Sequence, residues 1–156
     1  VLFRSIDPVR PRLLRAGTIV VKGEDWLARS DDLMATLRVL VARYRGGGNG
    51  GNELVGVVAE WPEFWNGPSS TSLGAAASGS LGKLMVLCGM IRQWVVGELR
   101  VEYVGLTVRE WKGQTPKRVV MQRMVKKYPQ LAGKGLDDNA LEAVGIGNFY
   151  LRSRPD

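Results

Sequence analysis

The chain has 156 residues, of which 22 are Lys or Arg and 15 are Asp or Glu, and its formal net charge is +7. It contains no histidine and a single cysteine, which excludes histidine-dependent catalytic centres, zinc fingers and an internal disulfide. Any enzyme chemistry must therefore come from carboxylates, lysines, hydroxyls or a metal ion held by oxygen ligands, which points to Mg²⁺ or Mn²⁺.

The length and the hydrophobic content of 45% predict one domain that spans residues 1–156. The excess of basic residues favours a polyanionic partner, and nucleic acid is the leading candidate. The first residues gain charge too early for a signal peptide, and no apolar run is long enough to span a membrane. Because Cys88 stands alone within an apolar run, we expect a buried core thiol in a reducing, cytoplasmic setting.

In chain order, "LFRSID" predicts a strand that ends at Asp7, where Pro8 stops it. "LLRAGTIVV" predicts a second strand over residues 13–21. From Ser30, which is a suitable cap, "SDDLMATLRVLVARY" predicts an amphipathic helix. "RGGGNGGN" then predicts a flexible loop; it lacks the ending of a phosphate-binding loop, so we assign it no site.

The next segment, "ELVGVVAE", predicts a buried central strand that places Glu60 at the edge of a sheet. A loop follows, then a long helix of small and apolar residues from Ser70 to Val96, and a strand at "RVEYVGL". Two helices complete the chain: a basic one at "TPKRVVMQRMVKKYP", and one from near Asp137 to about Leu151. This order predicts an α/β domain with a mixed sheet, in which strand ends and helix starts converge on one crevice.

The stretch "DDNALEAVGIG" places several acids at the start of the last helix. Asp138 and Glu142 are four residues apart, so they share one helix face. Acids in a first helical turn are also favoured by the helix macrodipole, and Asp138 alone is a suitable N-terminal cap. Both interpretations stay open at this point.

Four segments, "SIDP", "VVAEWP", "WKGQTPK" and "DDNALEAVGIG", resemble in order and spacing the motifs of the RuvC family of Holliday junction resolvases, particularly its bacteriophage and prophage members. The resemblance covers Phe3 to Leu151 and implies the ribonuclease H-like fold, a mixed β-sheet flanked by α-helices. The chain departs from the family after Asp7, where Val9 replaces a glycine and the N-terminal β-hairpin is shortened.

The resemblance implies a four-carboxylate site that binds two Mg²⁺ ions, for which Mn²⁺ can substitute. The ligands that it implies are Asp7, Glu60, Asp138 and Glu142, with Asp137 as the alternative to Asp138. The family has Asp more often than Glu at the position of Glu142.

The basic helix and the aromatic residues supply candidate DNA contacts. By resemblance Lys117 contacts the scissile phosphate; alternatively it only begins a helix that Thr115 caps. The basic residues Arg118, Arg123, Lys126 and Lys127 either contact the DNA backbone, without sequence preference, or form only a solvated helix face. Trp61, with Phe64 and Trp65, either stacks on splayed bases or covers a sheet edge or dimer contact.

The sequence therefore predicts a metal-dependent, structure-selective endonuclease that resolves four-way junctions and branched DNA in recombination and repair. The resemblance implies a homodimer. We expect a cytoplasmic location, which is the host cytoplasm if a phage encodes the chain. The alternative is a catalytically impaired protein of the same fold that binds branched DNA, which the shortened N-terminal region and Glu142 favour.

Overall fold

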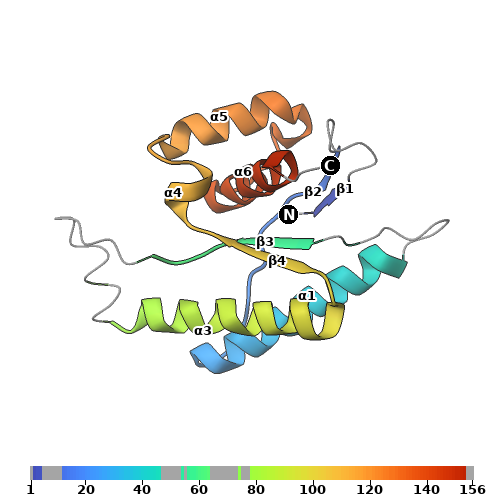
Figure 1. Ribbon diagram of the computed structural model, residues 1–156, viewed down its shortest axis with the longest axis vertical. Helices are drawn as coiled ribbons and strands as arrows, with labels where there is room; N and C mark the ends of the chain where they lie inside the picture. The colour runs from blue at the N-terminus through green and yellow to red at the C-terminus, as the bar shows by residue number, and fades with distance from the viewer. Residues whose placement is uncertain are drawn as a thin grey trace. The chain divides into compact units, whose positions relative to one another are not determined.

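The computed structural model describes residues 2–4, 12–46, 54, 56–63, 74 and 78–153, and they form a mixed α/β structure that is mostly helical (Figure 1). The chain divides into two compact units. Unit 1 comprises Val1–Thr18, Val58–Glu60 and Val108–Asp156, and unit 2 comprises Ile19–Val57 and Trp61–Thr107. That all 156 residues form one domain stays a prediction.

Unit 1 begins with two short antiparallel strands, β1 (Leu2–Arg4) and β2 (Arg12–Arg15). The predicted first strand contains β1, but its end at Asp7 lies outside the described residues. The predicted second strand is too long, because regular structure ends at Arg15. Val20, 82% exposed, shows why: a β-prone residue gains little from strand structure when its side chain is not covered.

Helices make up the rest of unit 1: α4 (Val108–Trp111), α5 (Lys117–Lys127), a 3₁₀ turn η2 (Pro129–Leu131) and α6 (Asp138–Ser153). In Figure 1 α5 and α6 lie beside each other, and they make the most extensive contact between any two elements. Both helices were predicted and are confirmed. Their apolar faces, with α4 and η2, bury a core that contains Trp111, Val120, Met124, Tyr128, Leu131, Leu141, Val144 and Tyr150.

The starts of these two helices differ in detail from the prediction. The cap of α6 is Asp137 rather than Asp138, because Asp137 Oδ1 accepts a hydrogen bond from the Ala140 N–H at 2.7 Å. Thr115 does not cap α5, which begins at Lys117 after Pro116 and has no side-chain cap. The fixed backbone angle of Pro116 starts this helix instead.

Unit 2 contains α1 (Trp26–Gly46), α3 (Ser80–Gln93), a π-helical turn η1 (Trp94–Leu99) and β4 (Glu102–Leu106). The strand β3 (Gly56–Glu60) begins in unit 2 and pairs in parallel with β4. Strands are confirmed within "ELVGVVAE" and "RVEYVGL". However, β3 is half-buried and its described sheet has only two strands, so it is not the buried central strand that was predicted. The described strands form two separate two-stranded sheets, not one mixed sheet.

Two helix boundaries in unit 2 also differ. The first helix starts at Trp26, not at Ser30, because Asp25 Oδ1 accepts a hydrogen bond from the Ala28 N–H at 2.9 Å and caps it. Ser30 Oγ instead donates within the helix to the Trp26 carbonyl. The long helix predicted from Ser70 is seen as α3 and η1, and most of its predicted first turns lie outside the described residues.

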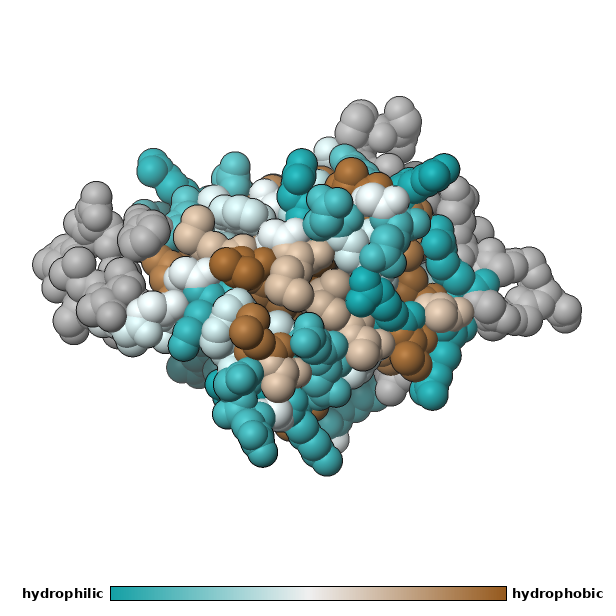
Figure 2. Space-filling model, turned by 90° about the horizontal axis from the view of Figure 1, so that it is seen from below, coloured by the Kyte–Doolittle hydropathy of each residue, from teal (hydrophilic) through white to brown (hydrophobic). Residues whose placement is uncertain are grey.

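The core of unit 2 forms around Met34, Trp94 and Val95, which bring α1 and η1 together. Cys88 is also buried, and burial raises its pKa, as expected for a core thiol. Apolar side chains also reach the surface: Leu84, Met85 and Val86 of α3 are 38–51% exposed. Figure 2 looks from the side of α1 and α3 and shows brown apolar side chains among teal ones. No helix in the described part of the chain has the length and apolar character of a membrane span.

Gly145 of α6 permits the closest contact in unit 1. A Cβ at this position would lie 3.0 Å from Trp111 Cζ3 and 3.1 Å from Val120 Cγ1, and both side chains are buried. Gly145→Ala should therefore lower the free energy of unfolding by about 1–2 kcal/mol, despite the better helix propensity of alanine. Chemical denaturation monitored by circular dichroism measures this.

Gly82 of α3 supplies the matched control, because no atom lies within 4 Å of its Cβ position. Gly82→Ala should raise the free energy of unfolding by about 0.5–1 kcal/mol, through helix propensity alone. If the two variants had the same effect, the contact between α6 and Trp111 would be wrong.

Candidate functional site

Unit 1 brings Glu60 close to the segment that follows β4. Glu60 is the last residue of β3, and its Oε2 accepts a hydrogen bond from Trp111 Nε1 at 3.1 Å. Trp111 is only 7% exposed, so its indole is fixed by the core of unit 1. A buried indole N–H needs an acceptor, and Glu60 supplies it, which orients the carboxylate at the end of the strand.

The second carboxylate, Glu142 of α6, is held between two lysines. Its Oε1 accepts a hydrogen bond from Lys112 Nζ, and its Oε2 lies 2.9 Å from Lys117 Nζ. The side chains of Glu142 and Lys112 are 16% and 15% exposed, whereas that of Lys117 is 40% exposed. Lys112 also lies over the Trp111 ring, 5.2 Å from its centroid. Through these contacts one connected cluster forms, which consists of Glu60, Trp111, Lys112, Lys117 and Glu142.

The pKa values follow from these contacts. Burial raises the pKa of Glu142, but the hydrogen bonds and charges of Lys112 and Lys117 outweigh it, so the net pKa is lowered. The hydrogen bond to Glu142 raises the pKa of Lys117, burial opposes this, and the charges of Glu142, Asp138 and Glu60 raise it further. The carboxylates of Glu142, Asp138 and Glu60 therefore all act on the ammonium group of Lys117. Because its pKa is lowered, Glu142 stays ionised at neutral pH.

Asp138 and Asp137 have different roles. Asp138, the first residue of α6, is exposed, and its carboxylate has no hydrogen-bond partner within the described part of the chain. Asp137 uses one oxygen to cap α6, and its other oxygen accepts a hydrogen bond from Thr18 Oγ1 at 2.8 Å. These bonds lower the pKa of Asp137, with the Ala140 N–H as the largest cause. Asp138 is thus the acid of the pair that is available to a ligand.

Several predicted residues lie elsewhere or outside the description. Asp7, Phe64 and Trp65 are not among the described residues. Trp61 is half-buried in unit 2, where its ring covers Gly105 of β4. This contact matches the sheet-covering interpretation of Trp61; stacking on DNA stays a prediction.

The predicted basic residues of α5 lie along its exposed surface. Arg118, Arg123 and Lys126 are exposed, and no carboxylate in the described part of unit 1 forms an ion pair with them. Lys127 Nζ donates to Asn148 Oδ1 at 2.5 Å, so it is committed to a contact between α5 and α6. Lys117 also donates to Asn139 Oδ1 at 3.3 Å.

Sequence reasoning assigned no role to Trp111 or Lys112, although both belong to the quoted "WKGQTPK" segment. What places them is a turn: Gly113 has a φ of 55°, and its N–H donates to the Arg109 carbonyl. This left-handed residue ends α4 and lets the chain reverse before α5. Lys112 and Lys117 consequently reach the same residue of α6.

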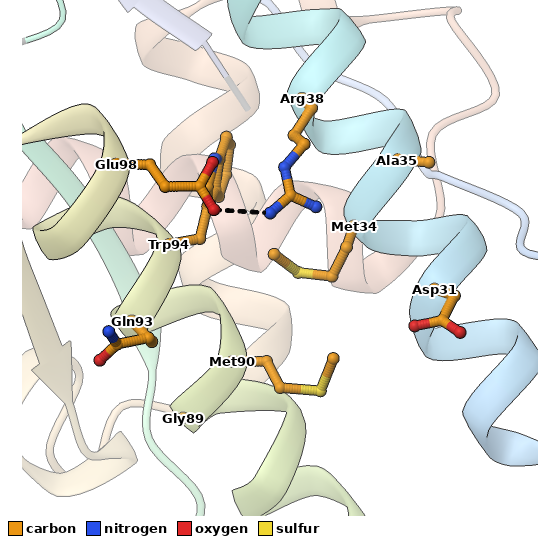
Figure 3. Close-up of a pocket in the computed structure, with 9 residues that line it drawn as sticks. All are labelled: Asp31, Met34, Ala35, Arg38, Gly89, Met90, Gln93, Trp94 and Glu98. Carbon is orange, nitrogen blue, oxygen red and sulfur yellow. Dashed lines mark hydrogen bonds and ion pairs between the residues drawn. The ribbon is translucent and has the colours of Figure 1, made fainter.

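A separate hollow of about 590 Å³ lies in unit 2 between α1 and α3 (Figure 3). Met34 and Met90 extend into it, and the Arg38–Glu98 ion pair, 2.8 Å long, lies at one end beside Trp94. Both charged side chains are about half exposed or more, so the pair contributes little stability. The hollow is mainly apolar and contains no group arranged for catalysis.

The donor chemistry of Glu60, Asp138 and Glu142 fits a hard divalent cation, because carboxylate oxygens are the ligands that Mg²⁺ prefers. Among the described residues, however, no three acidic side chains form a metal-binding group. Lysine ammonium groups neutralise Glu142 in this arrangement. Comparisons of the chain with family models, curated proteins and solved structures found no match.

Because the pKa of Glu142 is lowered in the folded chain, the stability of the fold should depend on pH. In the unfolded chain a glutamate titrates near its ordinary value of 4.5, and in the folded chain Glu142 titrates below it. Its contribution is therefore present above pH 4.5 and is lost as the pH falls through the folded value. Glu142→Gln should cost about 1–3 kcal/mol at pH 7, because Lys112 loses its counter-charge, and much less near pH 3.

Denaturant unfolding of both proteins at a series of pH values measures this difference. Glu24→Gln is the control, because Glu24 is exposed and forms no ion pair with described residues. A cost for Glu142→Gln that does not change with pH would mean that the ion pairs contribute no stability.

Proposed function

We propose that this chain is a metal-dependent, structure-selective endonuclease that hydrolyses four-way junctions and other branched DNA, on a ribonuclease H-like fold. The observation that carries the proposal is the meeting of distant residues in unit 1. Glu60 ends a strand and Glu142 lies on the last helix, yet Trp111 and Lys112, adjacent in sequence, bind one each. Acids at a strand end and on a final helix are what the resemblance to junction resolvases requires.

The carboxylates have the chemistry to hold divalent ions in such an enzyme. We assign this role to Glu60, Asp138 and Glu142, together with Asp7 from the sequence. A bound Mg²⁺ or Mn²⁺ would neutralise the scissile phosphate and lower the pKa of the attacking water. No histidine is present to act as a general base, so these acids must perform the chemistry.

The two lysines have a part in substrate binding. Lys112 and Lys117 already have a carboxylate as their anionic partner, and a DNA phosphate offers the same kind of acceptor. We propose that Lys117, the more exposed of the two, exchanges Glu142 for the phosphate when DNA binds. Arg118 and Lys126 on α5 contact the neighbouring backbone and add affinity without sequence preference.

A homodimer in the cytoplasm completes the proposal, so that two sites can cut opposite strands in recombination or repair. The exposed apolar residues of α3 and its Gly89, whose Cβ position is open, suit close approach of a second copy. Sedimentation with junction DNA tests this; a monomer alone at micromolar concentration would exclude paired cutting.

A second candidate function is binding of branched DNA without cleavage. Two observations favour it: both oxygens of Glu142 are paired with lysines, and no three described acids form a metal-binding group. The cleavage experiment separates the two candidates.

Cleavage of an end-labelled synthetic four-way junction, with linear duplex beside it, in Mg²⁺, Mn²⁺ or EDTA tests the proposed activity. We expect metal-dependent, symmetric nicking of the junction that Glu60→Gln lowers at least about 100-fold, because an amide does not replace a bridging carboxylate. Glu24→Gln, an exposed change of the same kind, should cleave normally. Tight binding without cutting in either metal would support the second candidate.

Two substitutions distinguish the roles of the adjacent acids Asp137 and Asp138 in cleavage. Asp138→Asn should reduce cleavage at least about 100-fold without a change in stability, because the carboxylate makes no hydrogen bond that holds the fold. Asp137→Asn should keep most of the activity, because asparagine caps a helix as well as aspartate does. The opposite pattern in the same junction assay would make Asp137 the ligand.

A further inference from the structure

A hollow of about 400 Å³ lies in unit 1 where α4, α5 and α6 meet. It shares Trp111 and Lys112 with the site of the proposed cleavage, but none of the carboxylates of that site lines it. We name it the α5–α6 hollow. Its principal lining residues are Trp111, Val120, Arg123, Asn148, Phe149 and Arg152. A cavity of this size accommodates a ligand of the size of one nucleotide.

The floor of the hollow is apolar and aromatic. Trp111 and Val120 are 7% and 6% exposed, so they are fixed by the core, and Phe149 is half-buried. Gly145 also lines the hollow, and Trp111 and Val120 pack closely against its backbone. A flat heteroaromatic ring is the ligand that such a surface binds best.

The rim of the hollow is positively charged. Arg123 and Arg152 are exposed, neither forms an ion pair with a described carboxylate, and no described acid lines the hollow. Burial, and after it the charge of Arg152, lower the pKa of Lys127. Cations therefore repel one another here, and an anion would relieve the repulsion.

Asn148 supplies a directional group. It is 7% exposed, and its Oδ1 accepts hydrogen bonds from Lys127 Nζ and from Tyr128 Oη at 3.0 Å. These two donors fix the orientation of the amide. Its Nδ2 group is then the donor available to a ring nitrogen or carbonyl of a ligand in the hollow.

We propose that the α5–α6 hollow binds a nucleotidyl unit, with the base against Trp111 and Phe149 and the phosphate between Arg123 and Arg152. The hollow combines an aromatic surface, an amide donor and two guanidinium groups that have no ion-pair partner among the described residues. Together these groups match a base that carries a phosphate better than a base or a phosphate alone. The unit comes either from a free nucleotide or from an unpaired nucleotide in a DNA strand. The proposal does not depend on cleavage.

Calorimetric titration of the full chain in EDTA tests the proposal, with dAMP, deoxyadenosine and inorganic phosphate as separate probes. We expect dAMP to bind at least about tenfold more tightly than either of the other two, since it alone satisfies both parts of the hollow. A competing single-stranded oligonucleotide of deoxyadenosines distinguishes the sources: displacement of dAMP indicates a nucleotide within DNA, and no displacement a free nucleotide.

Substitution of the two arginines at the rim of the α5–α6 hollow tests whether they bind the phosphate. The double variant Arg123→Gln/Arg152→Gln should weaken dAMP binding at least about tenfold. Arg109→Gln/Lys134→Gln is the matched control, because it removes two exposed charges of unit 1 outside the hollow and should leave binding within about twofold. Phe149→Leu should weaken dAMP binding but not phosphate binding.

Equal affinities for dAMP and inorganic phosphate, or equal losses in the two double variants, would overturn the proposal. Circular dichroism of each variant separates loss of binding from loss of fold. Asp138→Asn should bind dAMP normally, because Asp138 does not line the hollow, so failure of the nucleotide site and failure of the proposed nuclease are distinguishable.

Discussion

The pairing of Glu142 with Lys112 and Lys117 is the interaction on which the site in unit 1 depends. It places a carboxylate that is 16% exposed between two ammonium groups, which keeps it ionised although burial opposes ionisation. It also connects α6 to the segment between α4 and α5. Trp111, adjacent to Lys112, continues the connection to Glu60 at the end of β3. One turn, at Gly113, therefore determines how two distant acids are brought together.

This arrangement constrains any reaction at the site. Like charges that meet without a cation repel each other, so a group of carboxylates needs positive partners in every state. In the structure the partners are lysines; in the proposed enzyme divalent ions share that role with Lys112, while Lys117 turns to the phosphate. Loss of Lys112 from Glu142 is costly because both are largely buried, whereas Lys117 exchanges more easily because it is 40% exposed.

The sequence predicted the order of the main strands and helices, including the two final helices, since hydrophobic period carries that information. That Glu60, Asp138 and Glu142 form one site stays a prediction, and the pairing of Lys117 with Glu142 was not predicted. The sequence did not predict the cap at Asp25, because Ser30, within the same helix, is also a suitable cap residue. It did not predict the cap at Asp137, because Asp137 and Asp138 cap equally well until tertiary contacts choose one. It also missed Trp111 and Lys112, whose role arises from a left-handed turn and from the core beneath the indole. The basic residues Arg123 and Lys126 were predicted together, but only Arg123 lines the α5–α6 hollow.

The central claim is that Glu60, Asp138 and Glu142 form one cation-binding site. Paramagnetic line broadening by Mn²⁺, observed on the side-chain carboxyl signals of the labelled chain, tests it most directly. We expect these three signals to broaden at lower Mn²⁺ concentrations than the signal of Glu24, and Glu60→Gln to remove this selectivity. If the three signals broaden no earlier than Glu24, the carboxylates of unit 1 serve only to anchor lysines, and the metal-dependent mechanism is wrong.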